Sequence, residues 1–354
     1  MHVDFISGIE LSRRLYTEAV RPLLSDLAHS AALIGHGSEV LGFDTPRSTD
    51  HDWGPRLLLF LGADDLARHG PRIDDLLSER LPATIAGHPT SLVPNELGTR
   101  HLRHTTGRVH HAVVIAEPAA WLTGHLGFNP LAGVTTEDWL ATPAQTLAEV
   151  TAGAIFHDGL GALETARQAL DWYPDDVWRY VLACQWQRIG QEESFVGRCG
   201  EVGDELGSAV VAARLVRDVM RLRLLIGRVH PPYSKWLGSA FARLPGTAPL
   251  TAALTRTLAA GDWRDREQHL IAAYEIVAAL HNGLGLTASL DPHVRPFHDR
   301  PFQVLDAGRF TRALLESVTD PAVRARPVTG AIDQFVDSTD ALADHSLRRS
   351  IFRR

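Results

Sequence analysis

Two aspartates, Asp50 and Asp52, are separated by one residue and precede Arg56–Leu61, an apolar segment with the length of a strand. We expect the pair to lie in extended backbone, where side chains two residues apart point to the same face. Their carboxylates would then lie side by side and bind Mg²⁺, which prefers one or two such ligands together with substrate phosphates. Asp50 and Asp52 are therefore predicted metal ligands and catalytic residues.

A glycine-serine corner precedes the two aspartates. Residues 31–35 form a predicted buried strand, and Gly37 and Ser38 follow it at the start of a predicted helical turn. Backbone N–H groups at such a turn bind anions, and glycine lets a phosphate approach the main chain closely. A phosphate-binding corner followed by metal-binding carboxylates predicts metal-assisted phosphoryl transfer. The alternative is a strand-turn-helix corner followed by a solvated acidic loop.

The composition, 45% hydrophobic and 22% charged, is that of a soluble globular protein, and 354 residues suit two domains. No apolar run reaches the length of a membrane span, and residues 1–5 lack the pattern of a signal peptide. We therefore expect a cytoplasmic protein with no membrane partner. The formal net charge of −7 argues against a general nucleic-acid binder and favours a small-molecule acceptor.

The cysteines and histidines predict neither a disulfide scaffold nor a zinc site. Cys184 and Cys199 are the only cysteines, and we expect both to be reduced. The spacing of four neighbouring histidines fits no familiar set of zinc ligands, so we expect them on the surface or in loops. These are His101, His104, His110 and His111.

The order of elements predicts an α/β (α+β) domain with a mixed sheet over 1–140, followed by a larger all-α helical bundle over 141–354. Beside the strands at 31–35 and 56–61, the first domain has further predicted strands at 84–85 and 109–116. Its predicted helices span 8–29, with an interruption near Pro22, and 63–79. In the bundle the predicted helices span 143–170, 174–190, 191–227, 233–243, 249–260, 263–284, 308–318 and 330–350.

The segment from Leu33 to Asp52 resembles the Gly-Ser and Asp-x-Asp signature of the DNA polymerase beta-like nucleotidyltransferase superfamily. The helical region behind it is similar to that of the aminoglycoside adenylyltransferases. The whole chain looks like a bacterial group of nucleotidyltransferase-like proteins with a C-terminal domain of unknown function. The resemblance implies that Asp50 and Asp52 bind Mg²⁺ and that Gly37 and Ser38 hold the phosphate of ATP or another NTP. The implied reaction transfers a nucleoside monophosphate to an acceptor hydroxyl and releases pyrophosphate.

The chain departs from this superfamily at the third carboxylate, which often stands on a later strand. The corresponding segment here, residues 110–114, contains no acid. We therefore place the general base in the helical region, where Glu193 or the neighbouring Glu192 is the candidate towards an acceptor hydroxyl. The alternative is a solvated, charged helix face. The same predicted helix carries glycines every three or four residues, which indicates close helix packing or the approach of a substrate. These are Gly197, Gly200, Gly203 and Gly207.

Lys235 is the only lysine of the chain and stands at the start of a predicted helix, beside Tyr233 and Trp236. The first turn of a helix favours anions, and a lysine adds a compact, mobile charge that arginine does not reproduce. It looks like the counterpart of a lysine that binds phosphates in the streptomycin-modifying relatives. We therefore predict that Lys235 binds the nucleotide phosphates. Tyr233 is a candidate to stack on the base, with core packing as the alternative.

The leading hypothesis is a Mg²⁺-dependent nucleotidyltransferase that acts on a small-molecule acceptor. A first alternative is a nucleotide-binding regulatory protein with little or no turnover, which the absent third carboxylate favours. A second alternative is a nucleotidyltransferase that modifies RNA or protein.

Overall fold

The computed structural model describes residues 5–24, 26–96 and 98–352. The chain forms two compact units, one of residues 1–134 and 146–171, the other of residues 135–145 and 172–354. The first contains a mixed sheet with helices and the region from residue 136 on is mostly helical, which confirms the predicted fold class. The chain passes between the units more than once, and the predicted domain ranges, 1–140 and 141–354, stay a prediction.

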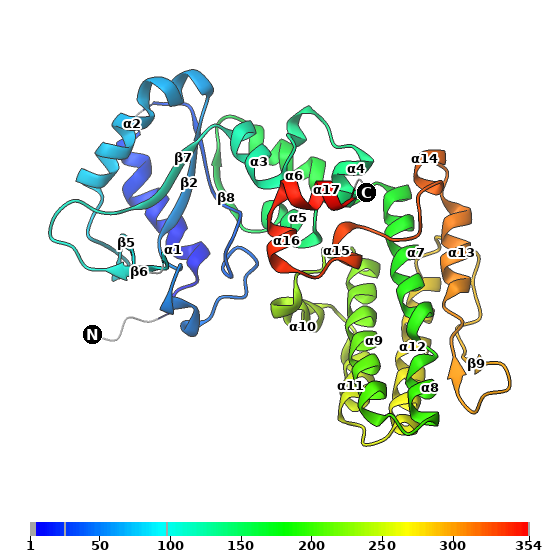
Figure 1. Ribbon diagram of the computed structural model, residues 1–354. Helices are drawn as coiled ribbons and strands as arrows, with labels where there is room; N and C mark the ends of the chain where they lie inside the picture. Colours follow the sequence, from blue (N-terminus) through cyan, green and yellow to red (C-terminus); the bar gives the residue numbers. More distant parts are fainter. Residues whose placement is uncertain (1–4, 25, 97, 353–354) are drawn as a thin grey trace. The chain divides into compact units, whose positions relative to one another are not determined.

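The sheet of the first unit has the strand order β7-β2-β1-β8 (Figure 1). Its strands are β1 (His29–Leu33), β2 (Arg56–Leu61), β7 (Ala112–Ala116) and β8 (Ala154–Asp158). Strand β1 is antiparallel to both β2 and β8, whereas β2 and β7 are parallel. Strand β1 ends beside the start of β2, so the connection over residues 34–55 lies at that end of the strands. Strand β7 begins at the same end, which is the edge of the sheet meant below.

Helices pack on both faces of the sheet, which explains why β2 is apolar without alternation from Leu57 to Leu61. On one face, α1 (Gly8–Arg14), the π-helical segment η1 (Leu15–Val20) and α2 (Ala63–Arg80) pack against the sheet. On the other face, α3 (Pro118–Leu126) and α6 (Ala162–Leu170) contribute Trp121 and Leu163 to a smaller core. The core of the first face includes Leu11, Leu15, Leu57, Leu59, Ile73, Leu77 and Val113.

The predicted helix over 143–170 is wrong. This segment forms α5 (Ala144–Thr151), then β8, then α6. Residues 154–156 are an apolar run too short for periodicity to assign to helix or strand. The backbone groups of this run are satisfied by pairing with β1, a partner more than a hundred residues away in the sequence. Gly153 lies between α5 and the strand, and Gly159 and Gly161 lie between the strand and α6, where Gly161 is the N-cap residue.

Five long helices form the core of the second unit: α7 (Asp175–Glu192), α9 (Glu205–Ile226), α11 (Ala248–Ala259), α12 (Trp263–Asn282) and α13 (Gly308–Ser317). Helix α7 packs against α9 and α13, and α12 packs against α9 and α11. These helices confirm the predicted bundle. The predicted continuous helix over 191–227 is wrong, because α7 ends at Glu192 and α8 (Phe195–Glu201) precedes α9. The predicted helix over 330–350 is three short helices, α15 (Ile332–Phe335), α16 (Thr339–Ala343) and α17 (His345–Phe352).

The remaining elements are ten residues long or shorter. The first unit also has η2 (Arg21–Leu23), η3 (Pro46–Asp50), η4 (Pro130–Ala132), β3 (Thr84–Ile85), β4 (His88–Pro89), β5 (Ser91–Pro94) and β6 (Arg100–Arg103). The second unit also has α4 (Thr136–Ala141), α10 (Ser234–Arg243), β9 (Arg295–Pro296), β10 (Gln303–Val304) and α14 (Pro321–Arg324). Among the described residues, no helix combines the length and the apolarity needed to cross a membrane.

Both cysteines are free, as predicted. Burial raises the pKa of the Cys184 thiol to about 12, so this side chain is a buried apolar group rather than a reactive one.

Candidate functional site

The glycine-serine corner is a tight turn at the end of β1. The carbonyl of Ser38 accepts a hydrogen bond from the N–H of Phe43 at 2.8 Å. Gly37 has a φ of +141°, and a Cβ atom there would lie 2.7 Å from Glu39 Oε2 and would also meet the guanidinium of Arg56. No other residue fits this position without displacing both side chains, so the glycine is required by the turn.

A buried ion pair between Arg56 and Glu39 contacts this corner. Arg56, the first residue of β2, donates from Nη2 to the carbonyl of His36 at 2.8 Å and also to Glu39 Oε1. Glu39 is fully buried, and Arg56 is largely so. Removing one partner of such a pair leaves an uncompensated charge and typically costs about 3–5 kcal/mol. The pair therefore ties the corner to the sheet and fixes the course of the main chain around Gly37.

Asp50 and Asp52 do not lie in a strand, so the premise that they share a strand face is wrong. Asp50 is the last residue of η3, and Asp52 has a left-handed φ of +47°. The sequence around Thr45 and Pro46 explains the difference, because a capping box and a proline in the first turn start a short helix. The next strand, β2, begins only at Arg56.

Each aspartate has its own basic neighbour. Asp50 Oδ1 lies 2.9 Å from His51 Nδ1, and Asp52 Oδ1 accepts from Arg100 Nε at 3.0 Å. The two side chains are 57% and 45% exposed, so both carboxylates are open to a cation from solvent. Among the described residues, no hydrogen bond or ion pair joins Ser38 to either aspartate. The connection between β1 and β2 thus contains the glycine-serine corner and both carboxylates, at one edge of the sheet. One oxygen of Asp52 already accepts a hydrogen bond from Arg100.

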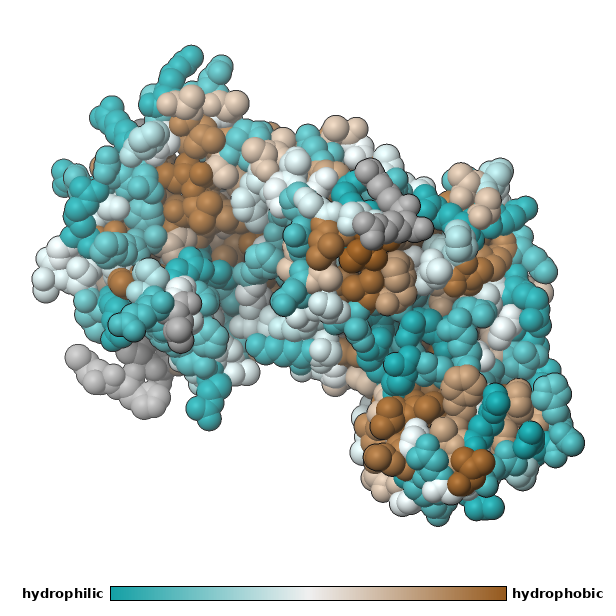
Figure 2. Space-filling model, viewed as in Figure 1, coloured by the Kyte–Doolittle hydropathy of each residue, from teal (hydrophilic) through white to brown (hydrophobic). Residues whose placement is uncertain are grey.

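Strand β7, which is parallel to β2, carries no carboxylate. Val114 pairs with Leu58 in the sheet and is 49% exposed. Figure 2 shows hydrophobic surface over this part of the first unit. The nearest acid, Glu117, is the N-cap of α3 and accepts from the N–H of Ala120 at 2.6 Å. Strand β7 is therefore apolar along its length, as the sequence indicates.

Glu193, the predicted general base, is buried at the end of α7 and holds a neighbouring loop. Its two carboxylate oxygens accept from the backbone N–H groups of Leu305, Asp306 and Ala307 at 2.7, 3.2 and 2.9 Å. Burial raises the pKa of Glu193 to about 7, against the lowering effect of the three donors. Through these contacts Glu193 fixes the backbone of residues 305–307. Its role as a base stays a prediction.

Glu192 is the alternative base, and it is engaged as well. It accepts hydrogen bonds from Arg214 Nε at 2.9 Å and from Nη2 at 2.6 Å, so the two side chains form a bidentate ion pair. Both contacts belong to the second unit, where they join the end of α7 to α9.

The glycine stripe belongs to two helices rather than one. In α8, a Cβ atom at Gly197 would lie 2.5 Å from the ring of Phe302, and one at Gly200 would overlap Trp263. Close packing against aromatic side chains is thus the reason for these two glycines. Beyond them the helix ends, and Asp204 caps α9 by accepting from the N–H of Gly207 at 2.8 Å.

Tyr233 and Lys235 lie at the start of α10, as predicted. Tyr233 is the N-cap residue, and its ring meets that of Trp236 edge-on at 5.0 Å. The ammonium group of Lys235 is exposed and lies 5.2 Å from the centre of the Trp236 ring. Lys235 therefore places an exposed positive charge at the first turn of a ten-residue helix.

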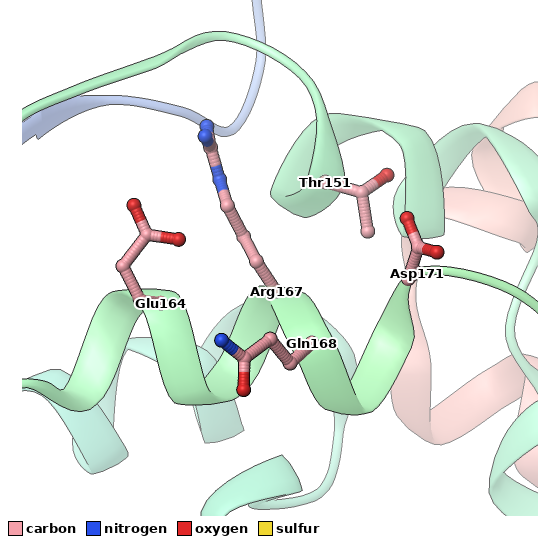
Figure 3. A pocket seen from close by; sticks show the side chains of 5 residues that line it. All are labelled: Thr151, Glu164, Arg167, Gln168 and Asp171. Atoms are coloured by element: carbon pink, nitrogen blue, oxygen red, sulfur yellow. The ribbon is translucent and has the colours of Figure 1, made fainter.

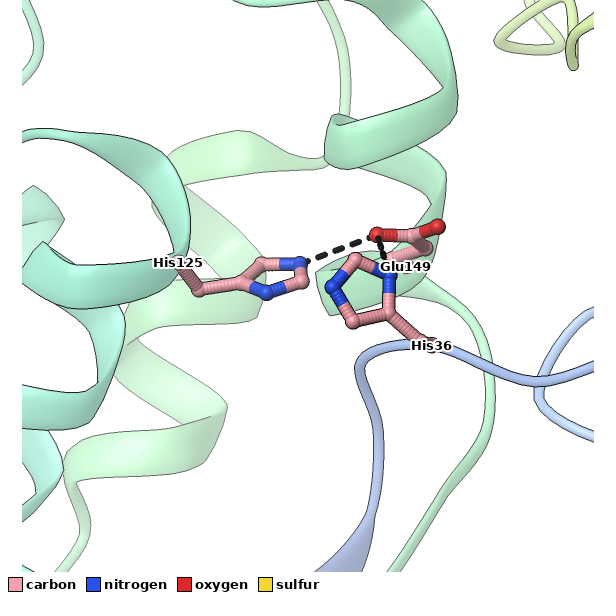
Figure 4. Close-up of side chains that lie close together, drawn as sticks. All are labelled: His36, His125 and Glu149. Carbon is pink, nitrogen blue, oxygen red and sulfur yellow. Dashed lines mark ion pairs between the residues drawn. The ribbon is translucent and has the colours of Figure 1, made fainter. Parts of the chain in front are cut away.

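A cluster that the sequence did not predict includes His36, the histidine of the corner itself. His36 Nδ1 lies 3.2 Å and His125 Nε2 lies 3.1 Å from the same oxygen, Oε2 of Glu149 (Figure 4). The three residues come from the turn after β1, from α3 and from α5. No local spacing signals the cluster, because its members are far apart in the sequence and meet only when β1, α3 and α5 pack together.

An open pocket with a volume of about 340 Å³ lies elsewhere in the first unit, over α5 and α6 (Figure 3). Arg167 is the largest of its lining side chains and donates hydrogen bonds to the carbonyls of Val150 and Ala152. Its guanidinium group therefore stabilises the turn after α5. None of the predicted site residues lines this pocket, whose lining comprises Thr151, Glu164, Arg167, Gln168 and Asp171.

A family model described as a domain of unknown function, DUF4037, matches residues 139–237. The match covers α5, β8, α6, α7, α8 and α9 and ends in α10, so it contains Glu193, Tyr233 and Lys235 but not the connection with Asp50 and Asp52. The comparison with curated proteins finds no match.

Proposed function

We propose that the protein is a Mg²⁺-dependent nucleotidyltransferase that transfers a nucleoside monophosphate from ATP or another NTP to a hydroxyl of a small-molecule acceptor. The observation that carries the proposal is the connection between β1 and β2. It holds a glycine-serine corner and two exposed carboxylates at one edge of a mixed sheet. Such a corner offers backbone N–H groups to phosphate, and the carboxylates offer oxygen ligands to the cation that accompanies a triphosphate.

In this proposal, Mg²⁺ held by Asp50 and Asp52 supplies neutralisation of the charge that develops on the transferred phosphoryl group. Gly37 and Ser38 hold the phosphates, and the Arg56–Glu39 pair keeps their main chain in place. Tyr233 and Lys235 are proposed nucleotide ligands, and Glu193 is the proposed base towards the acceptor hydroxyl.

The deciding experiment measures pyrophosphate release from each of the four NTPs, with Mg²⁺ and pooled hydroxyl-bearing acceptors. Asp50→Asn should reduce release by about 100-fold or more, because it removes a metal-binding charge. Asp64→Asn, at an exposed carboxylate in the first turn of α2, is the matched control and should retain activity. Equal activity of wild type and Asp50→Asn would refute the assignment of the site.

A nucleotide-binding regulatory protein is the second candidate, and the apolar strand β7 favours it, because no carboxylate stands there to activate an acceptor. Mg²⁺-dependent binding of ATP that is lost in Asp50→Asn, without pyrophosphate release from any acceptor class, would support this candidate. An acceptor pool that includes RNA and unfolded protein separates both candidates from a macromolecule-modifying enzyme.

A further inference from the structure

Two imidazoles and one carboxylate converge in the first unit, in the cluster of His36, His125 and Glu149 (Figure 4). One ligand atom from each residue lies within 4.8 Å of the other two. The two nitrogen-to-oxygen separations are 3.2 and 3.1 Å. These separations suit neighbouring ligands of one metal ion, since bonds of about 2.0–2.1 Å in tetrahedral geometry place ligand atoms roughly 3.3 Å apart.

The buried ring nitrogen Nε2 of His125 is the feature that points to a ligand. Its side chain is 8% exposed and its ring stacks on Trp121 at 5.0 Å between ring centres, so its orientation is fixed. Among the described residues, Nε2 of His125 is buried and has no partner with hydrogen-bond geometry, although Glu149 Oε2 lies 3.1 Å away. A buried ring nitrogen without a hydrogen bond is costly, and a metal ion bound to its lone pair would satisfy it.

The other two residues supply the charge and the access that a metal site requires. Glu149 is 7% exposed, and a buried carboxylate needs a cationic partner. His36 is 79% exposed on its side chain, so the cluster is open to solvent on that side. An ion can therefore enter and leave without unfolding, and a position remains for water or a further ligand.

We infer that His36, His125 and Glu149 form a binding site for a divalent transition-metal ion of the zinc type, separate from the proposed Mg²⁺ site. Two imidazole nitrogens and one carboxylate oxygen are a donor set that suits Zn²⁺, whereas Mg²⁺ takes oxygen ligands. Because His36 lies between Gly35 and Gly37, the bound ion ties the corner after β1 to α3 and α5. The inference stands without the proposed function, since it uses no nucleotide and neither aspartate.

The test titrates Zn²⁺ into the full chain after removal of metal by a chelator, with calorimetry for stoichiometry and affinity. Co²⁺ serves as a spectroscopic probe, because its visible absorption reports nitrogen and oxygen ligands in a site of low symmetry. We expect one Zn²⁺ bound tightly per chain. His36→Ala, His125→Ala and Glu149→Gln should each weaken this binding by about 100-fold or more, because each removes a direct ligand.

His293→Ala is the matched control, because His293 and Glu275 form an exposed histidine-carboxylate pair at 3.1 Å in the second unit. This variant should bind Zn²⁺ like the wild type. Asp50→Asn should also leave Zn²⁺ binding unchanged, so a failure of the proposed nucleotidyltransferase site and a failure of the zinc site give different results. Since His125 is buried, His36→Ala on the exposed side tests the site with an intact fold. Zn²⁺ affinity and Co²⁺ spectra that are the same in the wild type and in His36→Ala would overturn the inference.

Discussion

Glu149 shows how strongly one buried side chain depends on its neighbours in this protein. Burial opposes its ionisation, but the imidazoles of His125 and His36 outweigh burial and lower the pKa of Glu149 to about 2. The same carboxylate raises the pKa of His36. In the metal-free protein, the contacts of Glu149 with His36 and His125 therefore join three elements that are distant in the sequence.

Glu149 should make the stability of the metal-free protein depend on pH. Its folded-state pKa lies below the ordinary value of 4.5, so its contribution is present above pH 4.5 and is lost as the pH falls towards 2. A shift of this size corresponds to about 3 kcal/mol. Urea unfolding of wild type and Glu149→Gln between pH 5.5 and pH 3 measures it. The difference between the two proteins should shrink with falling pH, and a constant difference would contradict the assigned pairing.

Arg100 should compete with Mg²⁺ for Asp52. Its Nε lies 3.0 Å from Oδ1 of Asp52, and both side chains are half exposed, so the ion pair contributes about 0–1 kcal/mol. Arg100→Gln should therefore strengthen Mg²⁺-dependent nucleotide binding up to about fivefold. Arg108→Gln, which removes a surface arginine paired with Asp75 and Glu79, is the control and should have no effect. Weaker binding in Arg100→Gln would instead make Arg100 a nucleotide ligand.

At the scale of elements, the second unit depends on the close approach of α8 to aromatic side chains. Gly197 faces Phe302 and Gly200 faces Trp263, the first residue of α12. Both rings occupy the space that larger residues in α8 would need. Helix α8 is only seven residues long, so its position comes from this packing rather than from its own helix propensity.

Gly200→Ala should destabilise the protein by about 1–3 kcal/mol, because the added methyl group overlaps Trp263 and forces it to move. Gly238→Ala is the matched control, since it is also a helical glycine but its Cβ would meet only Met220 Cε, at 3.9 Å. This control should be neutral or stabilise α10 by up to about 1 kcal/mol. Urea unfolding of both variants gives the comparison, and equal free energies of unfolding would show that α8 adjusts freely.

On the scale of the whole molecule, each of the two compact units is built from two separate stretches of the chain. Residues 146–171 return to the first unit, where β8 completes the sheet beside β1. Residues 135–145 belong to the second unit, where the N–H of Ala144 donates to Asp333 at 3.1 Å and Asp138 pairs with Arg349. Neither unit is therefore a single stretch of sequence.

A fragment of residues 1–171 should fold, whereas a fragment of residues 1–140 should not. The shorter fragment lacks β8 and α6, which leaves β1 as an open edge strand and removes Leu163 from the core on one face. Circular dichroism during thermal unfolding should show a cooperative transition only for the longer fragment. A cooperative transition in the 1–140 fragment would show that β8 is dispensable and would favour the simpler division at residue 140.

Local patterns determined much of the fold. Strand β2 was predicted from its continuous apolar run, which reflects burial on both faces. Helices α7, α10, α11, α12 and α13 were predicted from helical periodicity, because burial on one face of a helix leaves a repeat in the sequence. A turn after the first strand was also predicted at Gly37 and Ser38, and their role in holding phosphate stays a prediction.

The tertiary structure decided the rest. Residues 154–158 became a strand because β1 offered a partner for their backbone, and α8 separated from α9 where Asp204 could cap a new helix. Asp50 and Asp52 do not lie in a strand, because a capped short helix forms at residues 46–50. The meeting of His36, His125 and Glu149 depends on packing among three elements. A sequence records which groups each residue carries and what its near neighbours allow, but the free energy of contacts between distant residues becomes visible only in the folded chain.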